Sequence, residues 1–416
     1  MNVAAQALDI DLMDGARSRG LGIIDDFNSI READPVFWSE KSQCWVVSRF
    51  EDVQDGFQCR KPLLNGQRSE FFLRSIPLEE RAAKVPVLSK FVNDWIVNLD
   101  GPSHARLRKL MMQAFTKKIV EQFRPYARER VNFLLDRAIA TPEIEFNEQI
   151  ARPLPGYVIF KVLGLPEEYF PDLRNWANDT VEGTTVAMPP VESLIKADRA
   201  MASMNEVVLR ELEKRKNNPS EDLLTTLMQA QEGGDKLSMD ELFGAMHILI
   251  VAGHDTTSNT MTLGTEALAR HPEAWQYLYE NPDKAADCVN ELMRYIAMST
   301  GQTRLVGEDF EWHGKQLKKG QLVFLSIAGA NRDPRAFQNP EKLDFQRDTA
   351  ESQVFAPGIH HCIGHLLAKM QLVEFFSSMV QRFERLEVLD SPLQFMPTTV
   401  FRGMYRMNVR FHPRAS

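Results

Sequence analysis

Residues 355–364 read Phe-Ala-Pro-Gly-Ile-His-His-Cys-Ile-Gly, and a helical pattern over residues 365–383 begins directly after them. Pro357 and two glycines place the single cysteine of this stretch, Cys362, in a tight turn that leads into a helix N-terminus. The helix dipole and the free backbone N–H groups at such an end stabilise a thiolate. A cysteine taken alone is most often a small buried residue, so the surrounding pattern decides its interpretation.

The composition is that of a folded globular chain. The protein has 416 residues, of which 44% are hydrophobic and 25% charged, and its net charge is −8. These values disfavour disorder and nucleic-acid binding. The four cysteines form no close pair, which disfavours zinc ribbons and disulfide scaffolds and favours a reducing, cytoplasmic setting. There is no secretory pattern and no apolar run of about 18 residues, so we expect no membrane span.

Helical periodicity dominates the chain. The longest helix is predicted over residues 238–270, where Ser238 and Glu241 form a capping box and residues 245–252 are apolar on nearly all sides. Ser220 is predicted to cap a shorter helix over residues 220–231, and Pro125 to open or kink another. Strand-like segments are short and are predicted at residues 45–48, 322–325 and 405–411, with a hairpin at 310–317.

We therefore predict a mainly α fold with a minor antiparallel β portion. No linker or repeat divides the chain, so residues 1–416 are expected to form one domain. Its N-terminal part, about residues 20–95, is expected to be β-rich, and the helical core is expected over about residues 96–416.

The cysteine loop is one of several motifs that resemble the cytochrome P450 family. The spacing of Phe355, Gly358, His360, Cys362 and Gly364 resembles the haem-ligand loop of that family. Further family-like motifs, in the family order, are His104 with Arg108, Ala-Gly-His-Asp-Thr-Thr at 252–257, Glu291 with Arg294, and Asn-Arg-Asp-Pro at 331–334 followed by Asp344 and Arg347. One departure is Ala356, where the family usually has glycine, and we expect only a slight adjustment of the loop there.

The resemblance implies the cytochrome P450 fold, with the long central helix crossing the haem. It implies a soluble bacterial-type haem-thiolate monooxygenase that binds haem b through Cys362 and inserts one oxygen atom from O2, with hydroxylation as the expected reaction. Thr256 would then assist oxygen activation, and Asp255 would relay protons. The alternative for this stretch is a kink in a long core helix, weakened at Gly253.

The same resemblance assigns the haem surroundings. It implies that the propionates are bound by four basic residues, His104, Arg108, Arg304 and His360. Phe355, Gly358 and Gly364 would contact the haem from the loop, and Ala252 and Gly253 from the long helix. Glu291 and Arg294, three apart on one helical face, would be a buried structural pair. For Arg108 a solvated helix face is an equally open alternative.

The substrate pocket is less well defined by the sequence. By position, Ile248, Val251, Thr300, Val400 and Phe401 would line it, beneath lid segments at residues 69–97 and 172–192. The apolar residues of these lid segments suit a hydrophobic substrate such as a terpenoid, steroid, fatty acid or polyketide, free or carrier-bound. Each of these residues fits the protein core equally well.

Electrons must come from a separate protein, because the chain has neither a GxGxxG fingerprint nor cysteines for an iron–sulfur cluster. We expect a ferredoxin or flavodoxin with its reductase, supplied by NAD(P)H, and a monomeric enzyme. Four basic residues would form the docking patch, or else an ordinary solvated face: Arg106, Lys109, Lys117 and Lys118. Two further functions stay open, a peroxide-driven hydroxylase and a non-catalytic haem sensor or binding protein. Asp255 and Thr256 disfavour both.

Overall fold

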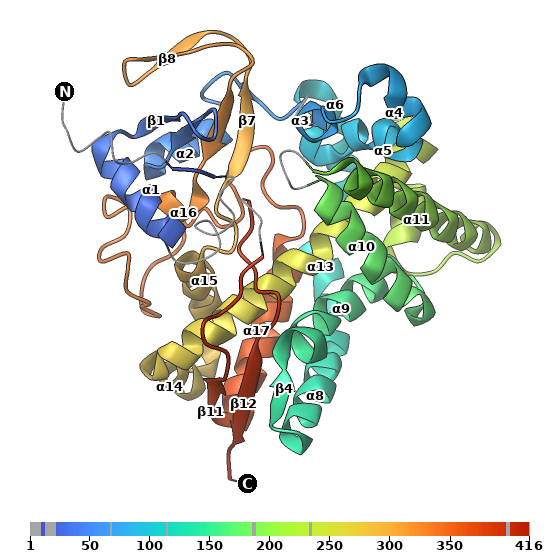
Figure 1. Cartoon of the computed structure of the whole chain (residues 1–416). Helices are drawn as coiled ribbons and strands as arrows, with labels where there is room; N and C mark the ends of the chain where they lie inside the picture. Colours follow the sequence, from blue (N-terminus) through green and yellow to red (C-terminus); the bar gives the residue numbers. More distant parts are fainter. Residues whose placement is uncertain are drawn as a thin grey trace. The chain divides into compact units, whose positions relative to one another are not determined.

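The computed structural model describes residues 10–12, 22–66, 69–113, 115–184, 189–232, 235–396 and 400–415 (Figure 1). Its contacts divide the chain into two compact units. Unit 1 comprises residues 1–64, 127–154 and 256–416, and unit 2 comprises residues 65–126 and 155–255. Helices α8 (Arg124–Ala140), α9 (Pro153–Leu163) and α13 (Met239–Arg270) contribute residues to both units. The single domain expected from the sequence stays a prediction.

Unit 1 contains a five-stranded sheet with the order β1-β2-β10-β7-β3. Its strands are β1 (Val36–Ser39), β2 (Cys44–Val47), β3 (Leu63–Leu64), β7 (Gln302–Val306) and β10 (Leu322–Leu325). β2 and β10 run parallel, whereas the other neighbours are antiparallel, so the sheet is mixed. Val323 of β10 lies between Trp45 of β2 and Arg304 of β7, and this register fixes the place of Arg304.

Smaller strands pair elsewhere. The predicted hairpin is formed by β8 (Phe310–Trp312) and β9 (Lys315–Leu317), and it turns at His313 and Gly314, whose φ angles are 49° and 75°. The C-terminal strand β12 (Asn408–Pro413) lies between β11 (Phe383–Val388) and β4 (Glu143–Glu145), as Figure 1 shows. In unit 2, β5 (Gln231–Glu232) pairs with β6 (Asp235–Lys236).

Helical residues outnumber strand residues in both units, which confirms the predicted mainly α class. Unit 1 holds α1 (Gly22–Ala33), α2 (Phe50–Phe57), most of α8 (Arg124–Ala140), the π-helix η4 (Asn147–Ala151), α14 (Pro272–Glu280), η6 (Pro282–Lys284), α15 (Ala285–Ile296), α16 (Ile327–Ala330) and α17 (His365–Arg382). Unit 2 holds α3 (Ser69–Leu73), α4 (Leu78–Lys84), α5 (Pro86–Phe91), η2 (Val92–Asp94), η3 (Ile96–Asn98), α6 (Gly101–Met112), α7 (Lys117–Gln122), most of α9 (Pro153–Leu163), η5 (Glu167–Tyr169), α10 (Phe170–Thr184), α11 (Val191–Asn217) and α12 (Leu223–Gln229). Within the described residues, none of the helices combines the length and hydropathy needed to cross a bilayer.

The long helix α13 (Met239–Arg270) begins as the sequence predicts. The backbone N–H of Glu241 donates to Oγ of Ser238 at 3.2 Å, and the N–H of Ser238 donates to Oε2 of Glu241 at 2.8 Å, which completes the capping box. The helix continues through Gly253 without interruption. A Cβ at that position would lie 3.1 Å from Cγ1 of Ile159, so the glycine permits close packing against α9.

Two local expectations were wrong. Residues 20–95, expected to be β-rich, contain only β1, β2 and β3 among their described strands and are mainly helical, because the sheet takes its other strands from residues 302–325. Asp222, not Ser220, caps α12, since its carboxylate accepts from the N–H of Thr225 at 2.7 Å. Arg215 holds this carboxylate in place by an ion pair of 2.7 Å.

Pro125, which was expected to open or kink a helix, is the second residue of α8 and so opens that helix.

Candidate functional site

The cysteine loop is closed by its own backbone. The N–H of Cys362 donates to the carbonyl of Phe355 at 3.0 Å, and the N–H of His361 donates to that of Gly358 at 3.0 Å. α17 starts three residues after Cys362, with Gly364 as its N-cap residue. Nδ1 of His365 donates to the carbonyl of Cys362 at 2.9 Å, because a carbonyl can only accept. The loop therefore presents Cys362 at a helix N-terminus, where a thiolate is favoured.

Two residues of the loop adopt left-handed backbone angles. Ala356 has φ = 52° and Gly358 has φ = 93°. A Cβ at Gly358 would lie 2.3 Å from the carbonyl oxygen of Phe57, so this glycine cannot be replaced without movement of the backbone. At Ala356 the methyl group is present in a conformation that costs an L-residue about 1–2 kcal/mol. The departure from the family pattern at position 356 therefore introduces local strain.

We expect Ala356→Gly to raise the free energy of unfolding by about 1 kcal/mol, because glycine removes that strain and loses part of the gain to chain entropy. Gly358→Ala should instead lower it by about 2 kcal/mol, since its methyl group meets the backbone. Urea unfolding of both variants measures the two effects. Equal signs for the two substitutions would contradict this account of the loop.

Several residues of the Cys362 loop are incompletely covered. Cys362 is exposed, and Phe355, Ile363 and Leu366 are only partly buried. A Cβ at Gly364 would meet nothing within 4 Å. An exposed thiol, partly buried apolar residues in the same segment and open space at Gly364 fit a flat, largely apolar prosthetic group. The donor chemistry and the room around it are thus compatible with haem bound through a thiolate.

Two of the predicted propionate ligands, Arg304 and His360, belong to unit 1. Arg304 is buried, with 4% of its surface exposed, and its guanidinium lies 5.0 Å from the centre of the Phe57 ring. Nη1 of Arg304 donates to the carbonyl of Thr303 at 2.8 Å. His360 is half-buried two residues before the cysteine. A buried guanidinium favours a carboxylate partner, which suits a propionate.

The pair of Glu291 and Arg294 is fully buried in unit 1. Nε and Nη2 of Arg294 lie 2.6 and 2.9 Å from the two carboxylate oxygens of Glu291, and both side chains are 0% exposed. Arg294 also donates to the carbonyls of Asn331, Pro340 and Lys342 at 2.8, 2.9 and 3.2 Å. Three of the five bonds that the arginine donates therefore tie α15 to residues 331–342.

Glu291 has two further donors. The N–H of Asp344 donates to its Oε1 at 3.0 Å, and Nε of Arg347 donates to the same oxygen at 3.2 Å. Charge and hydrogen bonds around the pair are thus satisfied by groups from residues 331–347, just before the cysteine loop. The pair is therefore suited to a structural role, because its partners in residues 331–347 are backbone groups and the side chain of Arg347.

In unit 2 the structure places the basic residues of α6 and α7. His104 and Arg108 share one face of α6, and His104 is 2% exposed. Lys109, Lys117 and Lys118 are exposed.

The fourth residue of the expected basic patch, Arg106, differs from the others. Its Nη1 forms an ion pair of 2.5 Å with Glu241, and its Nη2 donates to the carbonyl of Lys236 at 3.1 Å. The carboxylate neutralises its charge, so Arg106 is better described as a link within unit 2 than as part of the patch.

The middle of α13 carries the remaining candidates. Ile248 is half-buried, Val251 is 7% exposed, and Ala252 is exposed although it lies in the middle of a long helix. Ile248 and Ala252 are four residues apart and share one helical face. This face is therefore apolar and partly accessible, which suits contact with an apolar group. Asp255 and Thr256 follow within the next turn and are half-buried.

Asp255 has a neighbour that the sequence did not assign. Nδ1 of His254 lies 2.8 Å from Oδ1 of Asp255, and His254 is 3% exposed. Neighbouring positions on a helix do not normally face each other, so spacing rules did not predict the contact. A histidine inside an apolar helix was the available signal.

Three predicted pocket residues lie together in unit 1. The N–H of Thr300 donates to the carbonyl of Val400 at 2.9 Å, and Ser299 forms a β-bridge with Phe401. Thr300 is fully buried, whereas Val400 and Phe401 are half-buried. Thr300 is thus a core residue, and the two C-terminal residues are the more accessible pair. Within the lid segments, residues 185–188 lie outside the described residues.

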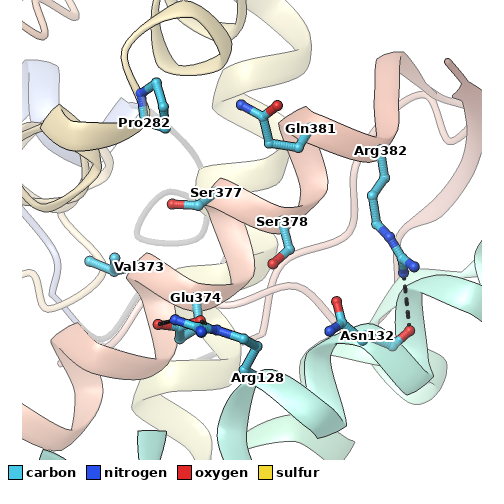
Figure 2. A pocket seen from close by; sticks show the side chains of 9 residues that line it. All are labelled: Arg128, Asn132, Pro282, Val373, Glu374, Ser377, Ser378, Gln381 and Arg382. Carbon is cyan, nitrogen blue, oxygen red and sulfur yellow. Dashed lines mark hydrogen bonds and ion pairs between the residues drawn. The ribbon is translucent and has the colours of Figure 1, made fainter. Parts of the chain in front are cut away.

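A cavity of about 480 Å³ opens elsewhere in unit 1, between α8, η6 and α17 (Figure 2). Arg128 and Glu374 line it and form an ion pair at 2.8 Å, and Nη1 of Arg382 donates to the carbonyl of Asn132 at 3.1 Å. The α17 residues that line it begin at Val373, about 12 Å along the helix from its first residue. The cavity therefore does not include the cysteine loop or any residue that the sequence predicted.

Proteins of one known family match most of this chain. The family model described as Cytochrome P450 matches residues 184–404. Cytochrome P450 CYP107DY1 of Priestia megaterium is 32% identical over 356 residues, which cover 83% of each chain. The structure of the Bacillus subtilis cytochrome P450 PksS, of the bacillaene polyketide synthase, covers 97% of this chain and all of its own, at 27% identity and a TM-score of 0.86. The structure of P450BioI in complex with an acyl carrier protein ligated to hexadec-9Z-enoic acid covers 95% of this chain and all of its own. Its identity is 27% and its TM-score is 0.84.

Proposed function

The chain belongs to the cytochrome P450 family and is a monooxygenase of that family, and on this basis we propose that it hydroxylates a hydrophobic small molecule with oxygen from O2. The observation that carries the proposal is the exposed Cys362 thiol, held at the start of α17 amid partly uncovered apolar side chains. A terpenoid, steroid, fatty acid or polyketide suits the apolar candidates on α13.

Haem iron is the cofactor of the family, and Cys362 would bind it as a thiolate. When bound, the haem supplies the oxygen-activating chemistry, which a thiolate ligand favours. Phe355, Gly358 and Gly364 would contact it from the loop. Arg304 and His360 would bind the propionates, a role that the burial of Arg304 supports.

The residues assigned to unit 2 enter the proposal on the sequence resemblance. His104 and Arg108 would bind propionates, and Ala252 and Gly253 would contact the haem from α13. The uncovered Ala252 and the uninterrupted helix at Gly253 are consistent with this assignment. Ile248, Val251, Val400 and Phe401 would line the substrate pocket. Thr300, predicted from the sequence with them, is fully buried and would support this lining from the core.

Asp255 and Thr256 would carry out the proton chemistry. Asp255 is half-buried, so its carboxylate can exchange protons with water and pass them inward. Thr256 supplies a hydroxyl that can accept one hydrogen bond and donate another. Its backbone carbonyl accepts from Oγ1 of Thr260 at 2.8 Å, which anchors this turn of α13.

Electrons would arrive from a separate ferredoxin or flavodoxin, reduced through its reductase by NAD(P)H. The exposed Lys109, Lys117 and Lys118 would attract an acidic carrier, without the paired Arg106. A monomer in the cytoplasm completes the proposal. A carrier-bound substrate is included, because one structural relative holds an acyl carrier protein.

Titration of the haem-loaded protein with a graded ligand panel tests the proposal. We expect at least one member among terpenoids, steroids, fatty acids, aromatics and macrolactones to shift the Soret band to the blue, because a ligand seated near the iron displaces water. The class that shifts the band is then tested for turnover. If free ligands have no effect and an acyl carrier protein conjugate does, the substrate is carrier-bound. The absence of a Soret band after haem supply would contradict the assignment.

Turnover separates the alternatives. Product that requires a surrogate ferredoxin system, NAD(P)H and O2 supports the monooxygenase. Product with peroxide alone would identify a peroxide-driven hydroxylase, and ligand binding without product under either condition would identify a haem sensor or binding protein.

A further inference from the structure

His254 and Asp255 contact each other although they are consecutive residues of α13. Nδ1 of His254 lies 2.8 Å from Oδ1 of Asp255. Consecutive side chains of an α-helix point roughly 100° apart, so they do not face one another by default. The Asp255 carboxylate is therefore turned toward the imidazole of the preceding residue, His254.

The hydrogen bond has a definite direction. An ionised carboxylate accepts hydrogen bonds and donates none, so the hydrogen must be on Nδ1 of His254. This holds whether the ring is neutral or charged. The Nδ1–H group is thus a donor that points at Oδ1 of Asp255.

Burial differs sharply across the pair. The side chain of His254 is 4% exposed, whereas that of Asp255 is 29% exposed. A ring enclosed to that degree is held in place by close packing. An aspartate side chain that is nearly a third exposed would otherwise sample several χ1 rotamers. The histidine is therefore the fixed member of the pair, and the acid is the member that it holds.

We propose that His254 is a positioning residue that fixes the rotamer of Asp255 and thereby sets how efficiently Asp255 relays protons to the site of oxygen activation. This role rests on the proposed function, in which Asp255 is the relay. Asp255 takes up one proton from water and passes one proton on, so its charge is restored after each transfer. His254 keeps its Nδ1 hydrogen throughout and acts only by holding Oδ1.

Two substitutions separate the hydrogen bond from the volume of the ring. Asparagine carries its amide nitrogen on Cγ, as histidine carries Nδ1, so His254→Asn can keep the donor in place. Glutamine is closer to histidine in size but carries its amide nitrogen one bond further out, so His254→Gln loses the donor at that place. If His254 merely filled space, glutamine would be the better replacement.

We expect His254→Asn to retain the ratio of product to NAD(P)H consumed within about twofold and His254→Gln to lower it about tenfold. General acid–base catalysis contributes about 10²–10⁴-fold in total, and only part of it is lost when the acid is present but misplaced. The KM for substrate should change little in both variants, and the solvent deuterium isotope effect should rise only in His254→Gln. The opposite order of the variants, or a change confined to KM, would overturn the proposal.

A second measurement does not depend on activity. Nitrogen-15 NMR of protein labelled at histidine reports which ring nitrogen carries hydrogen, and His254→Asn assigns the resonance. We expect Nδ1 of His254 to be protonated and its resonance to move in Asp255→Ala. An unprotonated Nδ1, or no response to Asp255→Ala, would overturn the proposal even if the His254 variants lost haem.

Failure of the proposed function and failure of the positioning role of His254 give different experimental results. If the wild-type protein shows no oxygen-dependent product with any reductant, the proposed function fails, whatever the NMR result. If the wild-type protein turns over and His254→Gln remains as tightly coupled as wild type, only the positioning role of His254 fails.

Discussion

Replacement of Arg294 by methionine is expected to lower the free energy of unfolding by about 3–5 kcal/mol. The change leaves the buried carboxylate of Glu291 without its main counter-charge and removes the donor from the carbonyls of Asn331, Pro340 and Lys342. Each buried acceptor left unsatisfied adds its own penalty. Total stabilities of proteins are about 5–15 kcal/mol, so the variant should be marginal or unfolded, as urea unfolding will show.

A matched control joins α7 to the start of α8. Arg124 and Glu121 are also three apart and bidentate, with nitrogen–oxygen distances of 2.6 and 2.8 Å, but their side chains are 30% and 42% exposed. Arg124→Met should therefore cost less than about 1 kcal/mol, because an exposed pair contributes little. Similar losses in the two variants would show that burial does not decide the contribution of Arg294.

Capping and turn preferences, which act between neighbouring residues, correctly predicted local parts of the fold. The capping box of Ser238 and Glu241 and the hairpin at His313 involve contacts within a few positions, and both are present. The tight loop at Cys362 is likewise closed by hydrogen bonds between residues less than eight apart. The glycine and capping preferences on which these predictions rest act over the same short range.

Contacts between distant segments were not predictable in the same way. Strand β2 pairs with β10, whose residues are more than 270 positions away, so the sheet could not be attributed to residues 20–95 from that segment alone. Arg106 was assigned to a surface patch because its partner Glu241 lies 135 residues away. In both cases the partner is set by packing, which one sequence does not reveal.

The candidate site shows the same division. The resemblance to the family motif selected Glu291 and Arg294, but the sequence could not supply the three carbonyls that complete the arginine's bonding. The contact of His254 with Asp255 contradicts the usual rule for neighbouring helix positions, so only the coordinates reveal it.

Substitution of Cys362 by serine or histidine is expected to abolish monooxygenase turnover even where haem stays bound. A thiolate donates electron density to the iron and favours O–O cleavage. The serine hydroxyl is far less acidic and does not form a comparable ligand, and an imidazole is a neutral donor. Oxygen-dependent product with NAD(P)H and a ferredoxin system should fall below detection in both variants.

Spectra of the reduced carbon monoxide complex make this expectation specific to the ligand. The long-wavelength Soret band that marks thiolate ligation should be present in wild type and absent from both Cys362 variants. Cys59→Ser is the matched control, because Cys59 is also exposed in unit 1 and also has a positive φ, 58°, but lies far from the loop in sequence. It should keep both the band and the turnover. Loss of the band in Cys59→Ser with its retention in Cys362→Ser would move the iron ligand to the other cysteine. Retention in both would exclude each thiol as the ligand, because the band requires a cysteine that neither substitution removed.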